Sequence, residues 1–354
     1  MRPEKQASPA KGPAEAACQA IDSIFQGDDM LVRHFRLPDQ PGRVCITFGE
    51  RTGTLAGTGF GTATLLASGI DVIAVQNTRK DWYDALAANG ELLAEIARRA
   101  AAYSSRAAYG SSMGAFAAIY FATVLDADCV VAISPLQSIW HDWDRRYAAD
   151  HPRCPARLVI GPESIAMHCR YNIFYDPFDL DGRHHAIFQG LIPAANLVSV
   201  PAPYSGHPSG HFLSSLGLLR PMVIEAIEGR LAGRPRYRDK RRSNQYVFNL
   251  AEACLARRKA PIALRLNDLL LRARSDSGEY FMQRAKILDA LRRHVDAAIA
   301  GEKAASLMPN NVHIVAHTLH IMRKAGLLAY AKRLAATHAG HAGNPVFERA
   351  KAGP

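Results

Sequence analysis

The 354-residue chain is poor in cysteine and has no long apolar run. Its six cysteines are scattered without a C-x-x-C pair, which argues against a disulfide framework and predicts reduced thiols. No apolar stretch approaches the ~18 residues that a membrane span requires. The first 20 residues carry charges and prolines instead of a continuous apolar stretch. We therefore expect no secretory signal and a cytoplasmic protein.

Acidic residues are also in deficit, with 32 Asp and Glu against 43 Lys and Arg, for a net charge of +11. Part of the excess lies between Arg230 and Arg242, where Asp239 is the single acid. A basic run of this kind can bind nucleic acid, an anionic glycan or a membrane surface. No aromatic interleaving or nucleic-acid motif accompanies it, so we interpret the run as a solvated linker and expect no nucleic-acid partner.

Short apolar runs alternate with helical patterns over residues 32–232, which predicts an α/β domain. Continuous apolar strands separated by helices are typical of a mostly parallel sheet that helices cover on both faces. Residues 1–31 are expected to form a flexible lead-in. The predicted strands are 43–48, 71–75, 105–109, 128–135, 171–175 and 196–200. Helices are predicted over 83–103, 115–122 and 209–231.

The basic, proline-containing segment 233–243 predicts a linker between two domains. Beyond it, over 244–354, apolar residues recur only at helical spacing, which predicts an all-helical domain. Pro309 and Pro345 lie 36 positions apart (345 − 309), close to the ~34-residue period of tetratricopeptide repeats. The region resembles such repeats, which implies a surface for a protein partner. The alternative is a generic helical bundle.

Residues 110–114 read Gly-Ser-Ser-Met-Gly and fit the motif G-x-S-x-G. The motif follows a predicted strand and precedes a predicted apolar helix, which is the context of a nucleophile elbow. The flanking small residues permit the tight turn that exposes the central hydroxyl. We therefore predict that Ser112 is a nucleophile. The alternative is a glycine-rich turn without chemistry.

A serine nucleophile needs a base within hydrogen-bond reach and a third group that orients the base. His207 follows the last predicted strand by a short loop and is the candidate base, ahead of His211 on the next helix. The candidate acids follow the preceding strand. Asp176 ranks first because it closes that strand, Asp179 ranks second and Asp181 third. Each of them can instead be a turn or capping residue.

The attacked carbonyl oxygen develops negative charge, which requires fixed hydrogen-bond donors. The backbone N–H of Met113, the residue after the nucleophile, is one predicted donor. The second donor is expected from the loop after the strand 43–48, at Gly49 or Glu50. Gly49 permits a close approach of the backbone.

From about residue 44 to residue 231, the chain resembles the α/β-hydrolase superfamily. The strand that ends at Gly49, the elbow at Ser112, the acid loop at Asp176 and the histidine at His207 follow that family's order. Residues 81–83 (Asp-Trp-Tyr), 110–115 and 175–184 are similar to those of a bacterial branch found near capsule and exopolysaccharide genes. The resemblance implies attack on an ester, thioester or amide through an acyl-serine. It implies neither a cofactor nor a metal.

The chain lacks the long lid of larger superfamily members. Only residues 136–158 are predicted to form a small cap, in which Trp140 and Trp143 line an acyl or sugar pocket or pack the cap itself. We expect an esterase or thioesterase acting on a small-molecule or glycan-linked ester. An acyltransferase with the same three catalytic residues is the alternative.

Three other functions compete with this hypothesis. Glycines between 53 and 61 make a glycine-rich loop, but no Gly-Lys-Ser/Thr follows, so a phosphate-binding P-loop is disfavoured. His207 and His211 have the i, i+4 spacing of a zinc site, but Pro208 and Gly210 between them favour a loop. A catalytically inactive scaffold that acts through its helical repeats is the third competitor.

Overall fold

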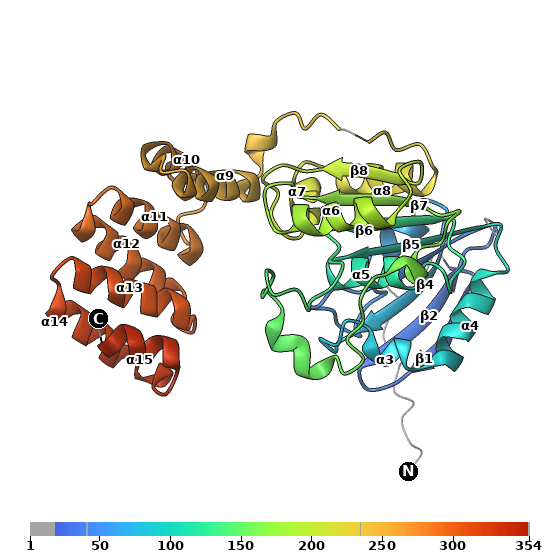
Figure 1. Ribbon diagram of the computed structural model, residues 1–354, viewed down its shortest axis with the longest axis horizontal. Helices are drawn as coiled ribbons and strands as arrows, with labels where there is room; N and C mark the ends of the chain where they lie inside the picture. The colour runs from blue at the N-terminus through green and yellow to red at the C-terminus, as the bar shows by residue number, and fades with distance from the viewer. Residues whose placement is uncertain (1–17, 40–41, 234, 353–354) are drawn as a thin grey trace, which may run out of the picture. The chain divides into compact units, whose positions relative to one another are not determined.

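The computed structural model describes residues 18–39, 42–233 and 235–352 (Figure 1). The chain divides into two compact units, Met1–Asp239 and Lys240–Pro354. Among the described residues, none of the helices has both the length and the apolar character needed to cross a membrane.

A single eight-stranded sheet runs through the first unit, in the order β1-β2-β4-β3-β5-β6-β7-β8. β2 pairs antiparallel with β1 and β4, and the other neighbouring pairs are parallel. The sheet is therefore mixed but mostly parallel. Its strands are β1 Ala20–Gln26, β2 Met30–Arg36, β3 Arg43–Phe48, β4 Asp71–Asn77, β5 Ser105–Ser111, β6 Cys129–Ile133, β7 Arg170–Tyr175 and β8 Leu197–Pro201.

Helices cover both faces of this sheet. Every residue of β4 and of β6 is buried, and successive side chains of a strand point to opposite faces. The predicted α/β fold class, with a mostly parallel sheet, is confirmed. The helices of this unit are α2 Thr62–Leu66, α3 Asp84–Ala87, α4 Gly90–Ala100, α5 Met113–Tyr120, α6 Asp181–Leu191, α7 Gly210–Ser215 and α8 Leu219–Ile227.

The sheet begins earlier than the sequence pattern indicates. β1 lies wholly, and the start of β2 partly, within the segment 1–31 that was expected to be a flexible lead-in. β1 is an edge strand whose residues are half-buried or exposed, so it lacks the continuous apolar pattern of a central strand. Residues 1–17 of that segment lie outside the described residues.

Two of the predicted long helices are interrupted. The expected helix 83–103 is divided into α3 and α4, and the Asn89 side chain caps α4 by accepting the Leu92 N–H at 3.1 Å. The expected helix 209–231 is divided into α7 and α8 at Gly217, which has a φ of 70°. This left-handed conformation is accessible to glycine at little cost and ends the first of the two helices.

The second unit is a succession of helical hairpins, and its first α-helix begins at Asn244 (Figure 1). Three of its helices begin at side-chain caps spaced 34 residues apart (277 − 243 and 311 − 277), namely Ser243, Ser277 and Asn311. This spacing describes a repeat of two helices. The helices are α9 Asn244–Ala256, α10 Ala260–Ala273, α11 Gly278–Ala290, α12 His294–Leu307, α13 Val312–Lys324, α14 Leu328–Thr337 and α15 Pro345–Ala352.

Candidate active site

Ser112 lies at the sharp turn between β5 and α5. Its backbone has φ 52° and ψ −113°, a conformation that residues other than glycine rarely adopt. The Ser112 N–H donates to the carbonyl oxygen of Ile133, 2.8 Å away, and so holds the turn against the adjacent strand β6. The strained backbone is thus stabilised by the sheet on which it lies.

The two glycines of the motif are required by packing. A Cβ atom on Gly110 would overlap the backbone of Gly114, and one on Gly114 would overlap the carbonyl oxygen of Phe48. The start of α5 therefore packs directly against the end of β3. This close approach explains why the turn carries small residues on both sides of Ser112.

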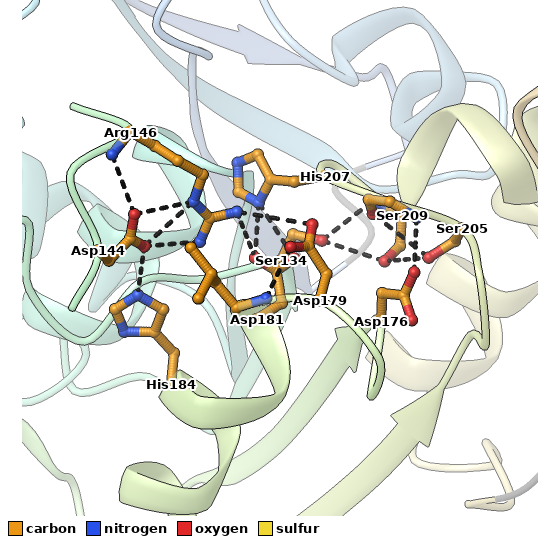
Figure 2. A network of polar contacts seen from close by, with 12 residues as sticks. Ser134, Asp144, Arg146, Asp176, Asp179, Asp181, His184, Ser205, His207 and Ser209 are labelled. Carbon is orange, nitrogen blue, oxygen red and sulfur yellow. Dashed lines mark hydrogen bonds and ion pairs between the residues drawn. The ribbon is translucent and has the colours of Figure 1, made fainter. Parts of the chain in front are cut away.

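Ser112, His207 and Asp181 form a continuous chain of hydrogen bonds. The Ser112 Oγ lies 2.7 Å from His207 Nε2. On the other side of the ring, His207 Nδ1 lies 2.9 and 3.0 Å from the two carboxylate oxygens of Asp181 (Figure 2). Ser112 and Asp181 are buried, and the His207 side chain is 9% exposed. Because an ionised carboxylate only accepts, Nδ1 carries the proton and Nε2 accepts the Ser112 hydroxyl.

The carboxylate that faces His207 is therefore that of Asp181, the lowest ranked of the three candidates. Asp176, ranked first, binds the backbone of the loop that carries His207. It accepts three backbone N–H groups at 2.8–3.0 Å, from Phe178, Tyr204 and Gly206. Burial raises the pKa of Asp176, and these hydrogen bonds act against that shift.

The remaining alternatives lie outside this chain of hydrogen bonds. Asp179 accepts the Leu180 N–H at 2.7 Å, and its carboxylate is 3.8 Å from Arg146. His211 is exposed on the first turn of α7, as expected. Of the sequence-predicted base and acids, the structure brings His207 to Ser112 and places Asp176, Asp179 and His211 elsewhere.

Asp181 is held ionised by its surroundings. Burial alone would raise its pKa, but His207, Arg146 and Ser134 outweigh burial and bring the pKa below its usual value. Arg146 Nη1 lies 3.0 Å from Asp181, and Nη2 of the same guanidinium lies 2.7 Å from Asp144 (Figure 2). One arginine therefore joins two buried carboxylates.

Behind Arg146, Asp144 makes a second contact, to His184 Nε2 at 2.9 Å. His184 Nδ1 accepts the Gln137 N–H at 3.1 Å, so the proton of this ring lies on Nε2. Burial lowers the pKa of His184, which keeps the ring neutral. His184 thus donates to Asp144 without adding charge, and the Arg146 cation remains the charge that compensates the two carboxylates.

The predicted oxyanion donors differ in what their N–H groups do. The Gly49 N–H donates to the Val75 carbonyl oxygen at 3.1 Å, so it belongs to the pairing of β3 with β4 and is not free to bind an oxyanion. The Gly49 carbonyl accepts the Tyr83 hydroxyl at 2.9 Å. Within the described residues, the N–H groups of Met113 and Glu50 have no backbone acceptor. Glu50, the alternative to Gly49, is therefore the second candidate donor.

The two cap tryptophans pack against different segments, Trp140 against the cap itself and Trp143 against the start of α6. The Trp140 ring stacks on His151 at 4.0 Å, and the Trp143 ring lies 4.6 Å from His184, between ring centroids. Arg183 lies 4.1 Å above the Trp143 ring. Their expected part in binding substrate stays a prediction.

The cap is tied to the loop after β3 by an ion pair whose carboxylate is buried. Arg51 makes two hydrogen bonds to Asp150, at 2.6 and 2.7 Å, and the Trp82 indole N–H donates to the same carboxylate at 3.2 Å. The Asp150 side chain is 1% exposed. Burial tends to raise the pKa of Asp150, but the hydrogen bonds from Arg51 and Trp82 hold it below its usual value.

The structure also bears on the zinc site and the phosphate-binding loop that compete with the hydrolase hypothesis. No cluster of three or more His, Cys, Asp or Glu suited to a metal occurs in the described part of the chain. Both nitrogens of His207 are engaged by Ser112 and Asp181, so the ring offers no lone pair to zinc. The glycine-rich loop lines a cavity of about 310 Å³ together with Gln76 and Asn77.

The sequence does not single out Asp181. It is the first residue of α6, where an acidic side chain commonly stabilises the start of a helix. Its partner Arg146 lies 35 positions earlier in the cap, and no sequence pattern joins the two. The same applies to Tyr147, the cap residue next to Arg146, whose ring lies 6.0 Å from the His207 ring between centroids.

Comparisons with known proteins find distant structural likeness alone. No family model matches the chain, and no curated protein matches it. Three crystal forms of the Pyrococcus furiosus esterase Pf2001 are similar in structure. The form in space group C2221 gives a TM-score of 0.42 and 15% identity over 65% of this chain and 97% of the esterase. The forms in P212121 and P21 give TM-scores of 0.36 and 0.37, each at 13% identity, over 55% of this chain and 84% and 86% of the esterase.

Proposed function

We propose that this protein is a serine hydrolase of the α/β-hydrolase type that cleaves an ester or thioester through an acyl-serine. The observation that carries the proposal is the unbroken path from Ser112 Oγ to His207 Nε2 at 2.7 Å and from His207 Nδ1 to Asp181 at 2.9 Å. The strained backbone of Ser112 supports it, because such strain is characteristic of reactive residues. In this proposal Asp181 takes the part that sequence analysis assigned first to Asp176.

The reaction follows from the proton positions. His207 Nε2 takes the Ser112 hydroxyl proton while Oγ attacks the carbonyl carbon, and the carbonyl π electrons move to oxygen. Asp181 stabilises the imidazolium that forms. When the carbonyl re-forms, the bond to the leaving group breaks, and the leaving group takes the proton from Nε2. Water then repeats the sequence on the acyl-serine and releases the acid.

The oxyanion is assigned to the N–H groups of Met113 and Glu50. Met113 is the first residue of α5, where backbone N–H groups have no acceptor inside the helix. The positive end of the helix dipole also favours an anion at this position. The engagement of the Gly49 N–H with Val75 supports the choice of Glu50 over Gly49.

Labelling by a fluorophosphonate probe tests the proposal. The wild type is expected to label and to hydrolyse short p-nitrophenyl esters, and Ser112→Ala is expected to do neither, because the probe bonds covalently to an activated serine. Ser111→Ala is the matched control, since it changes the neighbouring hydroxyl and leaves the proposed nucleophile. A wild type that is inert to both probe and esters would refute the proposal and favour the scaffold hypothesis.

Hydrolysis and acyl transfer share the acyl-serine and differ in the acceptor. Adding an alcohol or a sugar to an active esterase assay separates them, because a transferase forms the new ester in preference to the free acid. We propose hydrolysis as the primary activity.

We also propose that the two units have different functions. We assign the chemistry to residues 32–232, with the addition of β1 and the start of β2, and we assign partner binding to the helices from 244 to 354. The 34-residue spacing of the caps Ser243, Ser277 and Asn311 supports a tetratricopeptide-like array. Arrays of this type commonly present a surface to another protein.

A further inference from the structure

The cap binds the first turn of α6 at two points, although the mechanism above gives the cap no part. Arg146 Nη1 donates to a carboxylate oxygen of Asp181, the first residue of α6, at 3.0 Å (Figure 2). Three positions further along the helix, His184 Nε2 donates to the Asp144 carboxylate at 2.9 Å. Residues at i and i+3 lie on one face of a helix. The cap therefore contacts the face of α6 that carries the carboxylate facing His207.

Arg146 is oriented by Asp144 before it reaches Asp181. Its Nε and Nη2 donate to the two carboxylate oxygens of Asp144 at 3.0 and 2.7 Å, a paired geometry that fixes the plane of the guanidinium. The Arg146 backbone N–H donates to the same carboxylate at 3.1 Å. Nη1 then points to Asp181 at 3.0 Å, with Asp179 further away at 3.8 Å. The guanidinium thus presents Nη1 to Asp181 in a fixed direction.

The charge of Arg146 matters because the carboxylates are buried. The side chains of Asp144 and Asp181 are 1% and 0% exposed. A buried carboxylate without a partner cation tends to take up a proton. His184 is neutral, and His207 has to be neutral before it accepts the serine proton. Arg146 therefore supplies the positive charge that keeps Asp181 ionised.

We propose that Arg146 is a positioning residue, which aims the Asp181 carboxylate at His207 Nδ1 and keeps it charged. Arg146 Nη1 donates to Oδ1 of that carboxylate, while His207 Nδ1 lies 2.9 Å from Oδ1 and 3.0 Å from Oδ2. The carboxylate is thus bound on two sides. Arg146 acts through Asp181, whose ionised form holds the proton on Nδ1 of His207. This inference rests on the proposed serine-hydrolase function.

The proposal predicts how the reaction responds to pH when the Arg146 charge is lost. The charged or titratable groups that face Asp181 are His207, from the loop after β8, and Arg146, from the cap. Without the guanidinium, burial raises the pKa of Asp181 and His207 opposes it without help. A higher pH is then needed to ionise Asp181, so activity on the acid side of the pH profile is lost at a higher pH than in the wild type.

The experiment compares full-length wild type with Arg146→Met and Arg146→Lys on p-nitrophenyl acetate from about pH 5 to pH 9. Methionine keeps an unbranched side chain and removes the charge. At neutral pH we expect kcat to fall by on the order of 10²-fold with little change in KM, because the acid is misplaced or protonated. The acid limb of the profile is expected to move to higher pH. Arg146→Lys keeps a cation, so it is expected to leave the acid limb in place and to lose less kcat.

A double variant tests whether Arg146 acts through Asp181. Asp181→Asn leaves no carboxylate to aim or to keep ionised, so adding Arg146→Met is expected to lower kcat no further. If the two losses multiply, Arg146 acts independently of Asp181 and the inference fails.

Arg106→Met is the matched control. The Arg106 side chain is 18% exposed, against 23% for Arg146, and its guanidinium lies 3.3 Å from Asp128. It lies at the amino end of β5, whereas the elbow follows the carboxyl end. The same substitution at this site is expected to keep the wild-type kcat and pH profile. Thermal unfolding of all variants checks that they fold.

A wild-type kcat and pH profile in Arg146→Met would overturn the inference. A raised KM with unchanged kcat would also overturn it and make Arg146 a substrate-binding residue. An equal loss at every pH that lysine does not rescue would reduce Arg146 to packing of the cap. An inert wild type would instead overturn the hydrolase function itself.

Discussion

Asp181 and Asp176 lie within five positions of each other and are expected to respond differently to mutation. Asp181→Asn removes the charge that holds the proton on His207 Nδ1, so the ring can adopt the wrong tautomer. We expect kcat to fall by on the order of 10³- to 10⁴-fold with little change in KM. Steady-state kinetics on p-nitrophenyl acetate measures this loss.

Asp176→Asn is the matched control for that experiment. Its carboxylate accepts N–H groups from Tyr204 and Gly206 in the loop that carries His207. The substitution is therefore expected to lower the stability of the protein and to leave kcat less affected than Asp181→Asn does. If Asp176→Asn abolishes turnover and Asp181→Asn does not, the assignment of the acid returns to Asp176.

At the residue scale, the sequence indicated the serine and the histidine better than it indicated which carboxylate the histidine contacts. Ser112 and His207 could be proposed from the sequence because each has a local signal, an elbow motif for Ser112 and a Gly-His loop after a strand for His207. The acid could not be separated among three aspartates, since each lies after the same strand and each suits a turn or a helix start. Side-chain direction decided among them, and that direction depends on Arg146 from a distant segment.

At the scale of elements, the elbow depends on how closely α5 approaches β3. Gly114→Ala is expected to be destabilising by about 1–3 kcal/mol, as for an overpacked core, and to slow fluorophosphonate labelling of Ser112. The reason is that the new methyl group would overlap the Phe48 carbonyl oxygen. Denaturant unfolding and labelling rates measure the two effects.

Gly90→Ala provides the control for that substitution. Gly90 begins α4 and has open space where a Cβ would lie, so alanine is expected to leave stability unchanged or raise it by up to ~1 kcal/mol. Equal stability of the Gly114 and Gly90 variants would show that the tight crossing of α5 and β3 is not required.

Strands and helices were predicted unequally well, for a physical reason. Central strands such as β4 and β6 are buried on both faces and leave a continuous apolar signal. The edge strand β1 leaves none, because its residues are only half-buried. The break at Gly217 was missed because apolar residues continue at helical spacing on both sides of it.

At the scale of the whole first unit, stability is expected to fall as the pH is lowered from about 6.5 to 4. Burial lowers the pKa of His185 from its usual 6.5 to about 4, and the ring is stacked on Tyr175 at 3.7 Å and hydrogen-bonded to Ser199. In this range the unfolded chain binds a proton that the folded protein does not, so unfolding is favoured as the pH falls. His34 has a similar pKa of about 4 and contributes in the same direction.

His185→Phe tests that expectation, because it keeps the ring and removes the titration. Between pH 7 and pH 4, the variant is expected to lose up to about 3 kcal/mol less stability than the wild type. The three tryptophans all lie in the first unit, so their fluorescence reports its unfolding. Parallel pH profiles for the two proteins would contradict the prediction.

The sequence by itself determined the α/β class of the first unit, the helical character of the second and the position of the elbow. These depend on periodicity and on local turn chemistry, which neighbouring residues carry. Tertiary structure alone decided that Asp181 faces His207, that the Gly49 N–H is consumed by β4 and that Arg146 reaches Asp181. Each of these is a contact between segments far apart in the chain. Its geometry is set by packing and buried charge, which no local pattern encodes.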